Sequence, residues 1–186
     1  MSTDMVELSE KEELFTSLYN QDFSYVYSYV FARTAGNGQL TEDIVQETFV
    51  AAWLSLDRFD NKSTFRTWVC SISKNKLREY YRSAIHREKI ELPYNDDLAG
   101  HPSSFNLEKI VFDNETRLIV LEVLNGMPPL YRYALIMKYM DGLRVKGIAE
   151  VLDKSAKAVD GVLQRAKVAF EKEYLKVEGC DGNHGR

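Results

Sequence analysis

Residues 41–53 read TEDIVQETFVAAW, and this stretch decides which fold the sequence predicts. It lies between Gly38 and Pro93, an interval that contains no glycine and no proline. The turns of an all-β sandwich need such residues about every 8 to 12 positions, so the interval excludes that architecture. Within the stretch, apolar residues recur with helical spacing on one face, and carboxylates and an amide occupy another. The pattern predicts an amphipathic helix with Thr41 as its N-cap.

The composition of the whole chain agrees with a folded, all-α protein. Of the 186 residues, 45% are hydrophobic and 12% are aromatic, which is enough to form a core. No run approaches the roughly 18 apolar residues of a membrane span, and the N-terminal residues lack the pattern of a signal peptide. We therefore expect a cytoplasmic protein without membrane insertion.

On either side of residues 41–53 the sequence predicts further helices. Residues 14–35 have helical spacing, with a break expected near residues 20–22. A helix that begins near Thr64 places apolar residues on one stripe and three basic residues on another. These basic residues recur every four positions and form a basic ridge, namely Lys74, Arg78 and Arg82.

The C-terminal half of the chain predicts a second helical domain, at residues 114–178. It follows a segment at residues 87–113 that is rich in turn residues, which we interpret as a flexible acidic linker with a helix resuming near residues 105–107. In the second domain, a helix ends at Gly126 and the next begins at Pro128–Pro129. A short helix at residues 145–152 and a long one at 156–174, capped by Ser155, have the proportions of a helix-turn-helix. The spacing along the long helix predicts a buried core stripe of Val159, Leu163, Ala166 and Phe170. Residues 179–186 form a tail.

Charge is segregated along the chain although its net value is only -4. Residues 1–57 have 2 basic and 10 acidic side chains, whereas residues 58–89 have 9 basic and 3 acidic ones. Residues 90–113 are acidic again, with 1 basic and 5 acidic side chains, and residues 114–178 have 11 basic and 9 acidic ones. Attraction to phosphate depends on the local field within roughly 8–10 Å, so the basic segment favours a nucleic-acid partner that the net charge alone does not.

Nothing in the sequence predicts a catalytic or metal site. Cys70 and Cys180 lie far apart and form no CxxC unit, so we expect two free thiols. Cys180 with His184 supplies too few ligands for a closed zinc site. The three histidines have no motif relation to either cysteine or to a carboxylate pair, and no phosphate loop is present. We therefore expect no cofactor, no metal and no enzymatic activity.

Three blocks of the sequence resemble bacterial RNA polymerase sigma factors of the extracytoplasmic-function (ECF) group. The first is TEDIVQETFVAAW at residues 41–53, and the second is FRTWVCSISKN at residues 65–75, continuing to Tyr81 and Arg82. The third runs from IAEVL at residues 148–152 through Ser155 and Val159 to LQRAK at residues 163–167. Together the blocks extend over nearly the whole chain in the family's order. The resemblance implies a transcription initiation factor that binds core RNA polymerase, recognises the promoter −10 and −35 elements and promotes DNA opening.

The resemblance also implies roles for particular residues. Residues 9–86 would be sigma region 2, which binds core polymerase and melts the −10 element, and residues 114–178 would be region 4. The polymerase contacts carried over are Asp43, Gln46 and Glu47. The −10 contacts are Asn61, Lys62, Ser63, Lys74, Asn75, Arg78, Tyr81 and Arg82. The −35 contacts are Ser155, Lys157, Asp160, Gln164 and Lys167. Phe65 and Trp68 are assigned to the core, because their spacing is that of a buried stripe.

The third block departs from the family pattern. Lys146 and Gly147 stand where the family usually has two glutamates, and Asp153 takes the place of the turn glycine. Asp160 and Val162 replace a lysine and an arginine of the recognition helix. We therefore expect an altered −35 preference, since losing a bidentate arginine removes about 1–3 kcal/mol of base discrimination.

Two other interpretations fit parts of the sequence. A helix-turn-helix regulator that acts without core polymerase would share the third block but would not need the first two. An adaptor protein would use the acidic N-terminal domain for docking alone. Sigma factors of this group are typically held inactive by an anti-sigma factor, which the resemblance adds to the expected partners, core RNA polymerase and promoter DNA.

Overall fold

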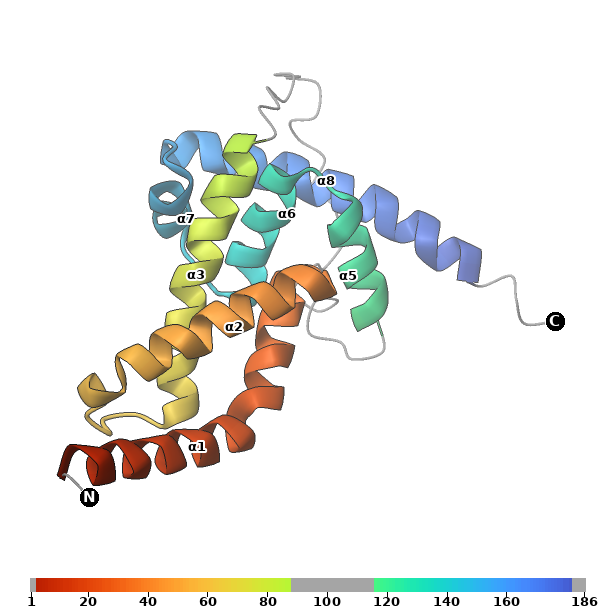
Figure 1. The fold of residues 1–186 in the computed structure, drawn as a ribbon. Coiled ribbons are helices and arrows are strands. Elements are labelled where there is room, and N and C mark those ends of the chain that lie inside the picture. The colour runs from red at the N-terminus through yellow and green to blue at the C-terminus, as the bar shows by residue number, and fades with distance from the viewer. Residues whose placement is uncertain (1–2, 88–115, 182–186) are drawn as a thin grey trace. The chain divides into compact units, whose positions relative to one another are not determined.

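The computed structural model describes residues 3–87 and 116–181, and within these ranges every regular element is a helix (Figure 1). This confirms the predicted all-α class. The helices, in chain order, are α1 (Thr3–Arg33), α2 (Gly38–Leu54), the short 3₁₀-helix η1 (Leu56–Arg58), α3 (Phe65–Arg87), α5 (Arg117–Gly126), α6 (Pro129–Leu135), the π-helix η3 (Ile136–Met140), α7 (Val145–Leu152) and α8 (Ala156–Asp181).

The chain divides into two compact units, Met1–Leu77 and Arg78–Arg186. The division lies inside α3, so the last turns of that helix are described with the second unit. The predicted linker at residues 87–113, and the helix expected near residues 105–107, lie outside the described residues apart from Arg87. Helix α8 extends to Asp181, three residues into the segment that was expected to be a tail.

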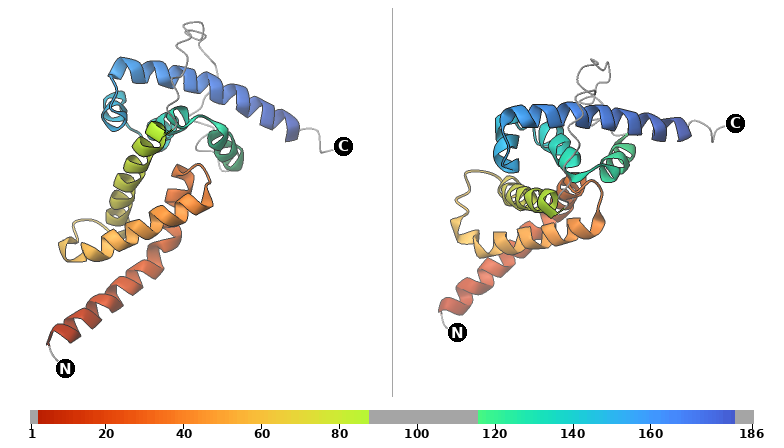
Figure 2. Two further views of the ribbon diagram at one scale, coloured as in Figure 1. Left: turned by 45° about the horizontal axis from the view of Figure 1, so that its top comes forward. Right: turned by 90° about the horizontal axis from the view of Figure 1, so that it is seen from above.

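Helix α1 is continuous, so the break expected near residues 20–22 was wrong. Figure 1 shows α1 as one helix that changes direction part-way along, and in the two views of Figure 2 part of it passes behind α2. The polar run was interpreted as a turn, but Asp22 is buried and its Oδ1 accepts a hydrogen bond of 2.8 Å from Nε of Arg66, at the start of α3. A long-range ion pair satisfies this carboxylate, and without glycine or proline nearby the backbone has no reason to leave the helix.

Helix α2 begins four residues earlier than expected, because Asn37 and not Thr41 is its N-cap. The side chain of Asn37 accepts a hydrogen bond of 3.0 Å from the backbone N–H of Leu40. Thr41 lies inside the first turn, fully buried, and its hydroxyl donates to the Asn37 carbonyl at 2.7 Å. The Thr41 and Thr34 hydroxyls are also hydrogen-bonded, at 2.7 Å. Both residue types favour the N-cap, and the chain reversal before α2 decides between them.

In the second unit, an arginine closes the end of α5. The guanidinium of Arg132, on α6, donates to the carbonyls of Leu124, Asn125 and Met127 at 2.8, 2.5 and 2.9 Å. The last carbonyls of a helix have no partner within the helix, so this cation binds two of them, together with the Met127 carbonyl just beyond α5, and complements the helix dipole. The predicted end of α5 at Gly126 and the start of α6 at Pro129 are both confirmed.

Helices α7 and α8 form the predicted helix-turn-helix. Helix α7 has the predicted bounds, and Ser155 caps α8 by accepting a hydrogen bond of 3.2 Å from the Ala158 N–H. The predicted core stripe of α8 is confirmed, since its four members are all buried: Val159, Leu163, Ala166 and Phe170. The helical period alone was enough to place these residues.

Candidate functional site

Four polar side chains form an exposed row on α2, and we call them the acidic row: Glu42, Asp43, Gln46 and Glu47. The other face of α2 is buried against the first unit through Thr41, Ile44, Val45, Thr48, Phe49 and Ala52. The three polymerase contacts expected from the sequence, Asp43, Gln46 and Glu47, therefore share one solvent-facing surface. A rigid row of carboxylates suits a basic partner surface.

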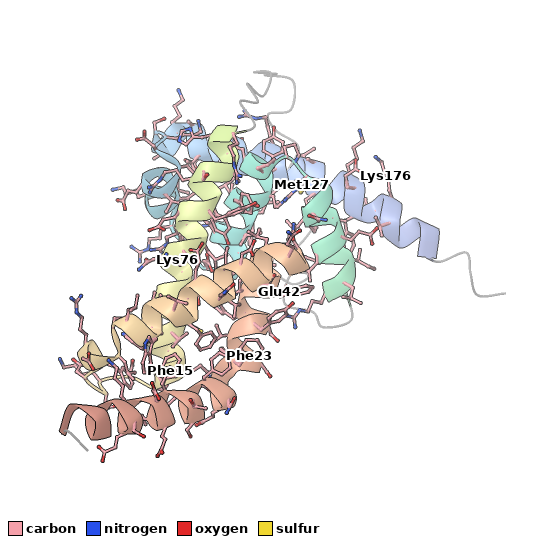
Figure 3. The ribbon with its side chains drawn as sticks, in the orientation of Figure 1. Phe15, Phe23, Glu42, Lys76, Met127 and Lys176 are labelled. Atoms are coloured by element: carbon pink, nitrogen blue, oxygen red, sulfur yellow. The ribbon has the colours of Figure 1, made fainter. Side chains whose placement is uncertain are left out.

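One member of the acidic row is already paired. An oxygen of Glu47 lies 3.3 Å from Nζ of Lys76, a half-buried residue of α3 (Figure 3). This ion pair links α2 to α3 within the first unit. Glu42, Asp43 and Gln46 make no ion pair or side-chain hydrogen bond with a described residue, so they are the members of the row most available to a partner.

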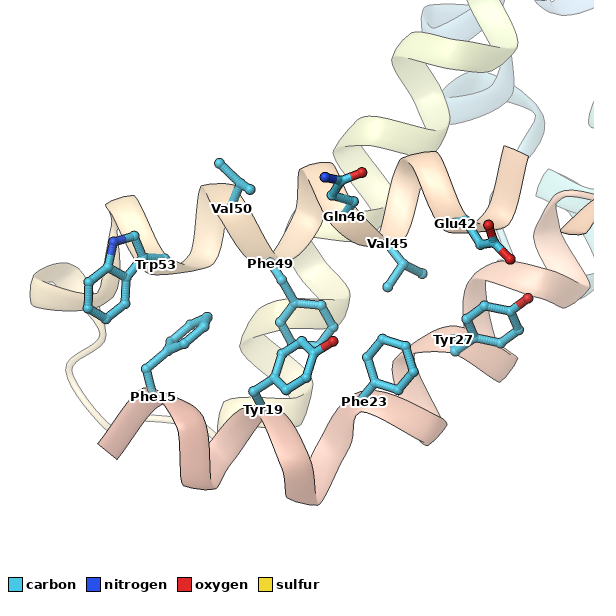
Figure 4. A pocket seen from close by; sticks show the side chains of 10 residues that line it. All are labelled: Phe15, Tyr19, Phe23, Tyr27, Glu42, Val45, Gln46, Phe49, Val50 and Trp53. Atoms are coloured by element: carbon cyan, nitrogen blue, oxygen red, sulfur yellow. The ribbon is translucent and has the colours of Figure 1, made fainter. Parts of the chain in front are cut away.

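An apolar groove of about 450 Å³ runs between α1 and α2, beside the acidic row (Figure 4). Four aromatic rings spaced four residues apart line its α1 side, namely Phe15, Tyr19, Phe23 and Tyr27. Its α2 side is lined by Val45, Phe49, Val50 and Trp53, with Glu42 and Gln46 among the lining residues. Ring centroids across the groove approach to 4.7 Å for Tyr19–Phe49 and 5.2 Å for Phe15–Trp53.

This groove was not expected from the sequence. Residues 14–35 have helical spacing, but the aromatic face of the predicted helix was not distinguished from its other faces. The repeat of an aromatic residue at every fourth position could have indicated it, because such residues form one stripe along a helix. The sequence does not indicate which helix faces that stripe, and the structure shows that it is α2.

The basic ridge lies along α3 as expected. Lys74 and Arg78 are half-buried and Arg82 is exposed, and Asn75 is exposed beside them. Since these residues belong to one continuous helix, they hold a fixed spacing suited to a repeating phosphate backbone.

Tyr81 differs from the other expected −10 residues because it is fully buried. Within the second unit its ring stacks on Tyr133, with 4.3 Å between the centroids. Nε of Arg82 donates to the Val151 carbonyl at 3.2 Å. The structure therefore places Tyr81 away from the solvent-facing side chains of the ridge.

The loop before α3 presents the remaining expected −10 residues, since Asn61, Lys62 and Ser63 are all exposed. Asn61 has a φ of 57°, a left-handed conformation that asparagine tolerates better than most residues. Asp60 accepts hydrogen bonds from the side chain and the backbone N–H of Lys62, and these lower the pKa of its carboxyl group below the ordinary 3.8. These contacts give the loop a defined shape.

An aromatic cluster of Phe59, Phe65 and Trp68 flanks this loop on both sides in the sequence. Phe65 is buried, as expected for a core residue, and its ring lies 5.8 Å from that of Trp68. Trp68 is only half-buried, and Phe59 lies 5.1 Å from it. The assignment to the core is therefore confirmed for Phe65, whereas Trp68 also reaches the surface.

The expected −35 residues are all exposed on the helix-turn-helix: Ser155, Lys157, Asp160, Gln164 and Lys167. Nζ of Lys167 lies 5.5 Å from the ring centroid of Tyr139, which is a cation–π distance. This contact holds the Lys167 side chain near Tyr139. Arg165, within the third block, was not among the expected −35 contacts, and its guanidinium lies 3.4 Å from where a Cβ on Gly161 would stand.

Val162 corrects one expectation about the recognition helix. We expected it to alter the DNA-reading face, but it is buried, with 4% of its surface exposed. Its position belongs to the core stripe of α8, next to Leu163. Asp153, the other departure, has a φ of 50° at the end of α7, so an aspartate takes the left-handed conformation that glycine adopts without strain.

Two buried groups have displaced pKa values. Burial raises the pKa of the Cys70 thiol above 9.0, and this cysteine is free. Burial also raises the pKa of Tyr133 to about 12, with a further contribution from the nearby Tyr80. Both groups therefore stay neutral near pH 7. Cys180 and His184, the other candidates for thiol or metal chemistry, have no described side chains.

No cluster of three or more potential metal ligands occurs in the described part of the chain. Among the same residues, no helix is both long and apolar enough to cross a membrane.

Family comparisons match both units. The model of Sigma-70 region 2 matches residues 14–86, and that of Sigma-70 region 4 matches residues 117–170. The chain is 28% identical over 151 residues to the ECF RNA polymerase sigma factor SigW of Bacillus subtilis, covering 76% of this chain and 79% of SigW. The chain belongs to the ECF sigma factors. It is thus a transcription initiation factor, and the resemblance found in the sequence is confirmed.

Two further similarities complete the comparison for this sigma factor. It is 31% identical over 140 residues to the probable RNA polymerase sigma factor RfaY of Xanthomonas campestris, covering 73% of this chain but only 34% of RfaY. A structure of the sigma factor RpoE in complex with the anti-sigma factor NepR from Bartonella quintana aligns with a TM-score of 0.44 at 20% identity. The alignment covers 88% of this chain and 97% of the RpoE chain.

Proposed function

We propose that this sigma factor divides its work between its two helical domains. Residues 9–86 dock on core RNA polymerase and melt the −10 element, residues 87–113 connect the domains, and residues 114–178 hold the −35 element. The observation that supports this most directly is the surface of the first domain, where the acidic row lies beside an apolar groove and the basic ridge follows on another helix. Binding of protein and of DNA thus has separate surfaces.

Docking uses the acidic row and the groove together. Asp43 and Gln46 face solvent without a described partner, and they supply charge complementarity and hydrogen bonding to a basic surface. The groove supplies the apolar contact area, and Val50 at its edge is 53% exposed. An amphipathic helix of the polymerase fits such a surface, because its apolar side chains enter the groove while its basic residues meet the row.

Opening of the −10 element uses the loop at residues 60–64 and α3. A flipped base needs a pocket or platform, and the exposed loop lies above the aromatic pair Phe59 and Trp68. Asn75, Lys74 and Arg78 then contact the strand backbone along the helix. Tyr81 acts in this scheme as a structural residue, in keeping with its burial.

The second domain holds the −35 element through phosphate contacts around α7 and the turn. Four exposed basic residues surround this region, namely Arg144, Lys146, Lys154 and Lys157. Their number predicts an affinity that falls steeply with salt, since each neutralised phosphate releases counterions.

Regulation and location follow from the family. Sigma factors are non-enzymatic transcription factors, and we infer that this chain likewise acts without catalysis, inside the cytoplasm. An anti-sigma factor is its natural inhibitor, and a partner that covers the acidic row and the groove would block polymerase docking directly. The alternative, a regulator that binds duplex DNA without polymerase, leaves the acidic row and the groove without a role.

The docking proposal is tested by Asp43→Arg in the full chain. Reversal of this charge should weaken binding to core polymerase at least tenfold, because it places a cation in the acidic row, where it repels the basic surface of the polymerase. Glu13→Arg is the matched control, since Glu13 is exposed and lies on the side of α1 opposite to Phe15. Equal affinity of Asp43→Arg and the wild type for core polymerase would refute the docking face.

The melting proposal is tested by the double variant Lys74→Glu with Arg78→Glu. It should bind core polymerase normally but form no open complex, which is measured by permanganate reactivity of unpaired thymines. Lys172→Glu with Lys176→Glu is a control with the same charge change on exposed residues of α8. If the double variant of the ridge lost core binding and melting to the same degree, the separation of the two surfaces would be wrong.

A further inference from the structure

The N-terminal half of α8 presents an exposed stripe that combines a lysine, an aspartate and a glutamine. Lys157, Asp160 and Gln164 follow one another at intervals of three and four residues, and all are exposed. The opposite side of the helix is buried, so the orientation of the stripe is fixed by the core. In a helix-turn-helix, the N-terminal residues of the second helix are those that contact base edges in the major groove.

An aspartate on this surface is unfavourable for general DNA binding. Its carboxylate repels phosphates, and Asp160 makes no ion pair or hydrogen bond through its side chain within the described residues. Lys157 lies three residues earlier on the same stripe, but it forms no ion pair with Asp160, so the carboxylate remains available. A carboxylate has one good partner on a base edge of the major groove, the amino group of cytosine, which donates a hydrogen bond.

The next exposed position along the stripe has a different chemistry. Gln164 lies four residues after Asp160, about 6 Å further along the helix axis, which is roughly two base-pair steps. Glutamine pairs with adenine by donating to N7 and accepting from the amino group. Between the two lies Gly161, whose missing side chain leaves room for the Arg165 guanidinium.

We propose that Asp160 and Gln164 are the specificity-determining residues of the −35 contact, with Asp160 selecting a cytosine and Gln164 an adenine about two base pairs away. Lys154, exposed in the turn before α8, and Lys157, exposed in its first turn, provide the phosphate attraction that offsets the charge of Asp160. This inference rests on the proposed role of the second domain. It assigns the altered −35 preference to a positive choice of base, and not merely to a lost arginine.

The test is a selection experiment with the full-length protein and core polymerase. A promoter library has a fixed −10 element and a randomised −35 region, and bound DNA is sequenced. The wild type should enrich cytosine at one position and adenine about two base pairs away. Asp160→Ala should lower the preference for cytosine about tenfold and strengthen binding to all other sequences. Asp160→Asn should change the preferred base at that position from cytosine to adenine, because an amide pairs with adenine.

Gln164→Ala should relax only the adenine position. Glu173→Ala is the matched control, because it removes the same charge from an exposed position of α8 outside the stripe and should leave the base preferences unchanged. If the wild type enriches a −35 sequence that Asp160→Ala and Asp160→Asn both leave unaltered, this inference is overturned while the proposed function stands. If the wild-type holoenzyme enriches no −35 sequence at all, the role of the second domain falls as well.

Discussion

The ion pair between Asp22 and Arg66 offers a sharp test of how the first unit is held together. Nε of Arg66 lies 2.8 Å from Oδ1 of Asp22, and the pair joins α1 to the first turn of α3. The two side chains differ in exposure, 6% for Asp22 and 45% for Arg66. Arg66 also lies over the ring of Tyr25, 4.5 Å from its centroid. We predict that the two partners have unequal effects when they are removed.

The inequality follows from which charge is left behind. Arg66→Ala leaves a buried carboxylate without a partner, which costs about 3 kcal/mol, the lower end of the range for breaking a buried pair because the pair is partly exposed. Asp22→Asn leaves an arginine that can be hydrated, and we expect a loss of about 1 kcal/mol. The double variant removes both charges, so its loss should be nearer 1 than 3 kcal/mol, and it should be more stable than Arg66→Ala alone.

Urea unfolding monitored by tryptophan fluorescence measures these differences in the free energy of unfolding for the first unit alone. The chain has two tryptophans, Trp53 and Trp68, and both belong to that unit. The dependence of the free energy on urea should be unchanged among the variants, which confirms that stability and not compactness differs. Arg58→Ala is the control, because Arg58 is exposed and makes no ion pair or side-chain hydrogen bond within the described residues. A double variant as unstable as Arg66→Ala would refute the argument that the unpaired carboxylate is the source of the loss.

Three further predictions concern single residues. Asp153→Gly should raise the free energy of unfolding of the second unit by about 1 kcal/mol, because glycine adopts the left-handed φ of 50° without strain, and a lower melting temperature would contradict this. Gly147→Ala should stabilise the same unit by a similar amount, since the nearest atom to an added Cβ is Leu143 Cδ2 at 3.9 Å, and calorimetry would detect the shift. Cys70 should react with iodoacetamide at pH 8 only as the protein unfolds, because burial raises its thiol pKa. The neutral thiol is favoured in the folded state, so its contribution to stability is complete below about pH 9 and is lost as the pH rises above that value. In a Cys180→Ser variant, which leaves Cys70 as the single cysteine of the chain, fast labelling of the native protein would argue against this burial.

Local pattern was sufficient wherever one face of a helix had to be buried. The bounds of α7, the end of α5 at Gly126 and the buried stripe of α8 were all predicted from the period of the apolar residues and from helix-ending residues. The same pattern placed Asp43, Gln46 and Glu47 on an exposed face, because the residues between them are apolar. These features depend on neighbours within a few residues of each other, so they can be predicted from the sequence alone.

Three of the expectations that failed depend on partners distant in the sequence, on a competing residue or on the packing of a helix. Asp22 does not end α1, because Arg66, 44 residues later, satisfies its carboxylate. Asn37 caps α2 in place of Thr41, although both suit the position. Val162 faces the core and not the DNA-reading surface, because the packing of α8 fixes how far its buried stripe extends around the helix.

Periodicity, turn residues and three motifs were enough to predict the all-α class, the order of the helices, the helix-turn-helix and the membership of the ECF sigma factors. Which polar groups pair and which remain available became visible only once the helices were packed together. The tertiary structure pairs Glu47 with Lys76, buries Tyr81 and opens the aromatic groove between α1 and α2. The physical reason is that periodicity specifies which face of a helix is buried, whereas the groups that meet across that face depend on how separate helices pack.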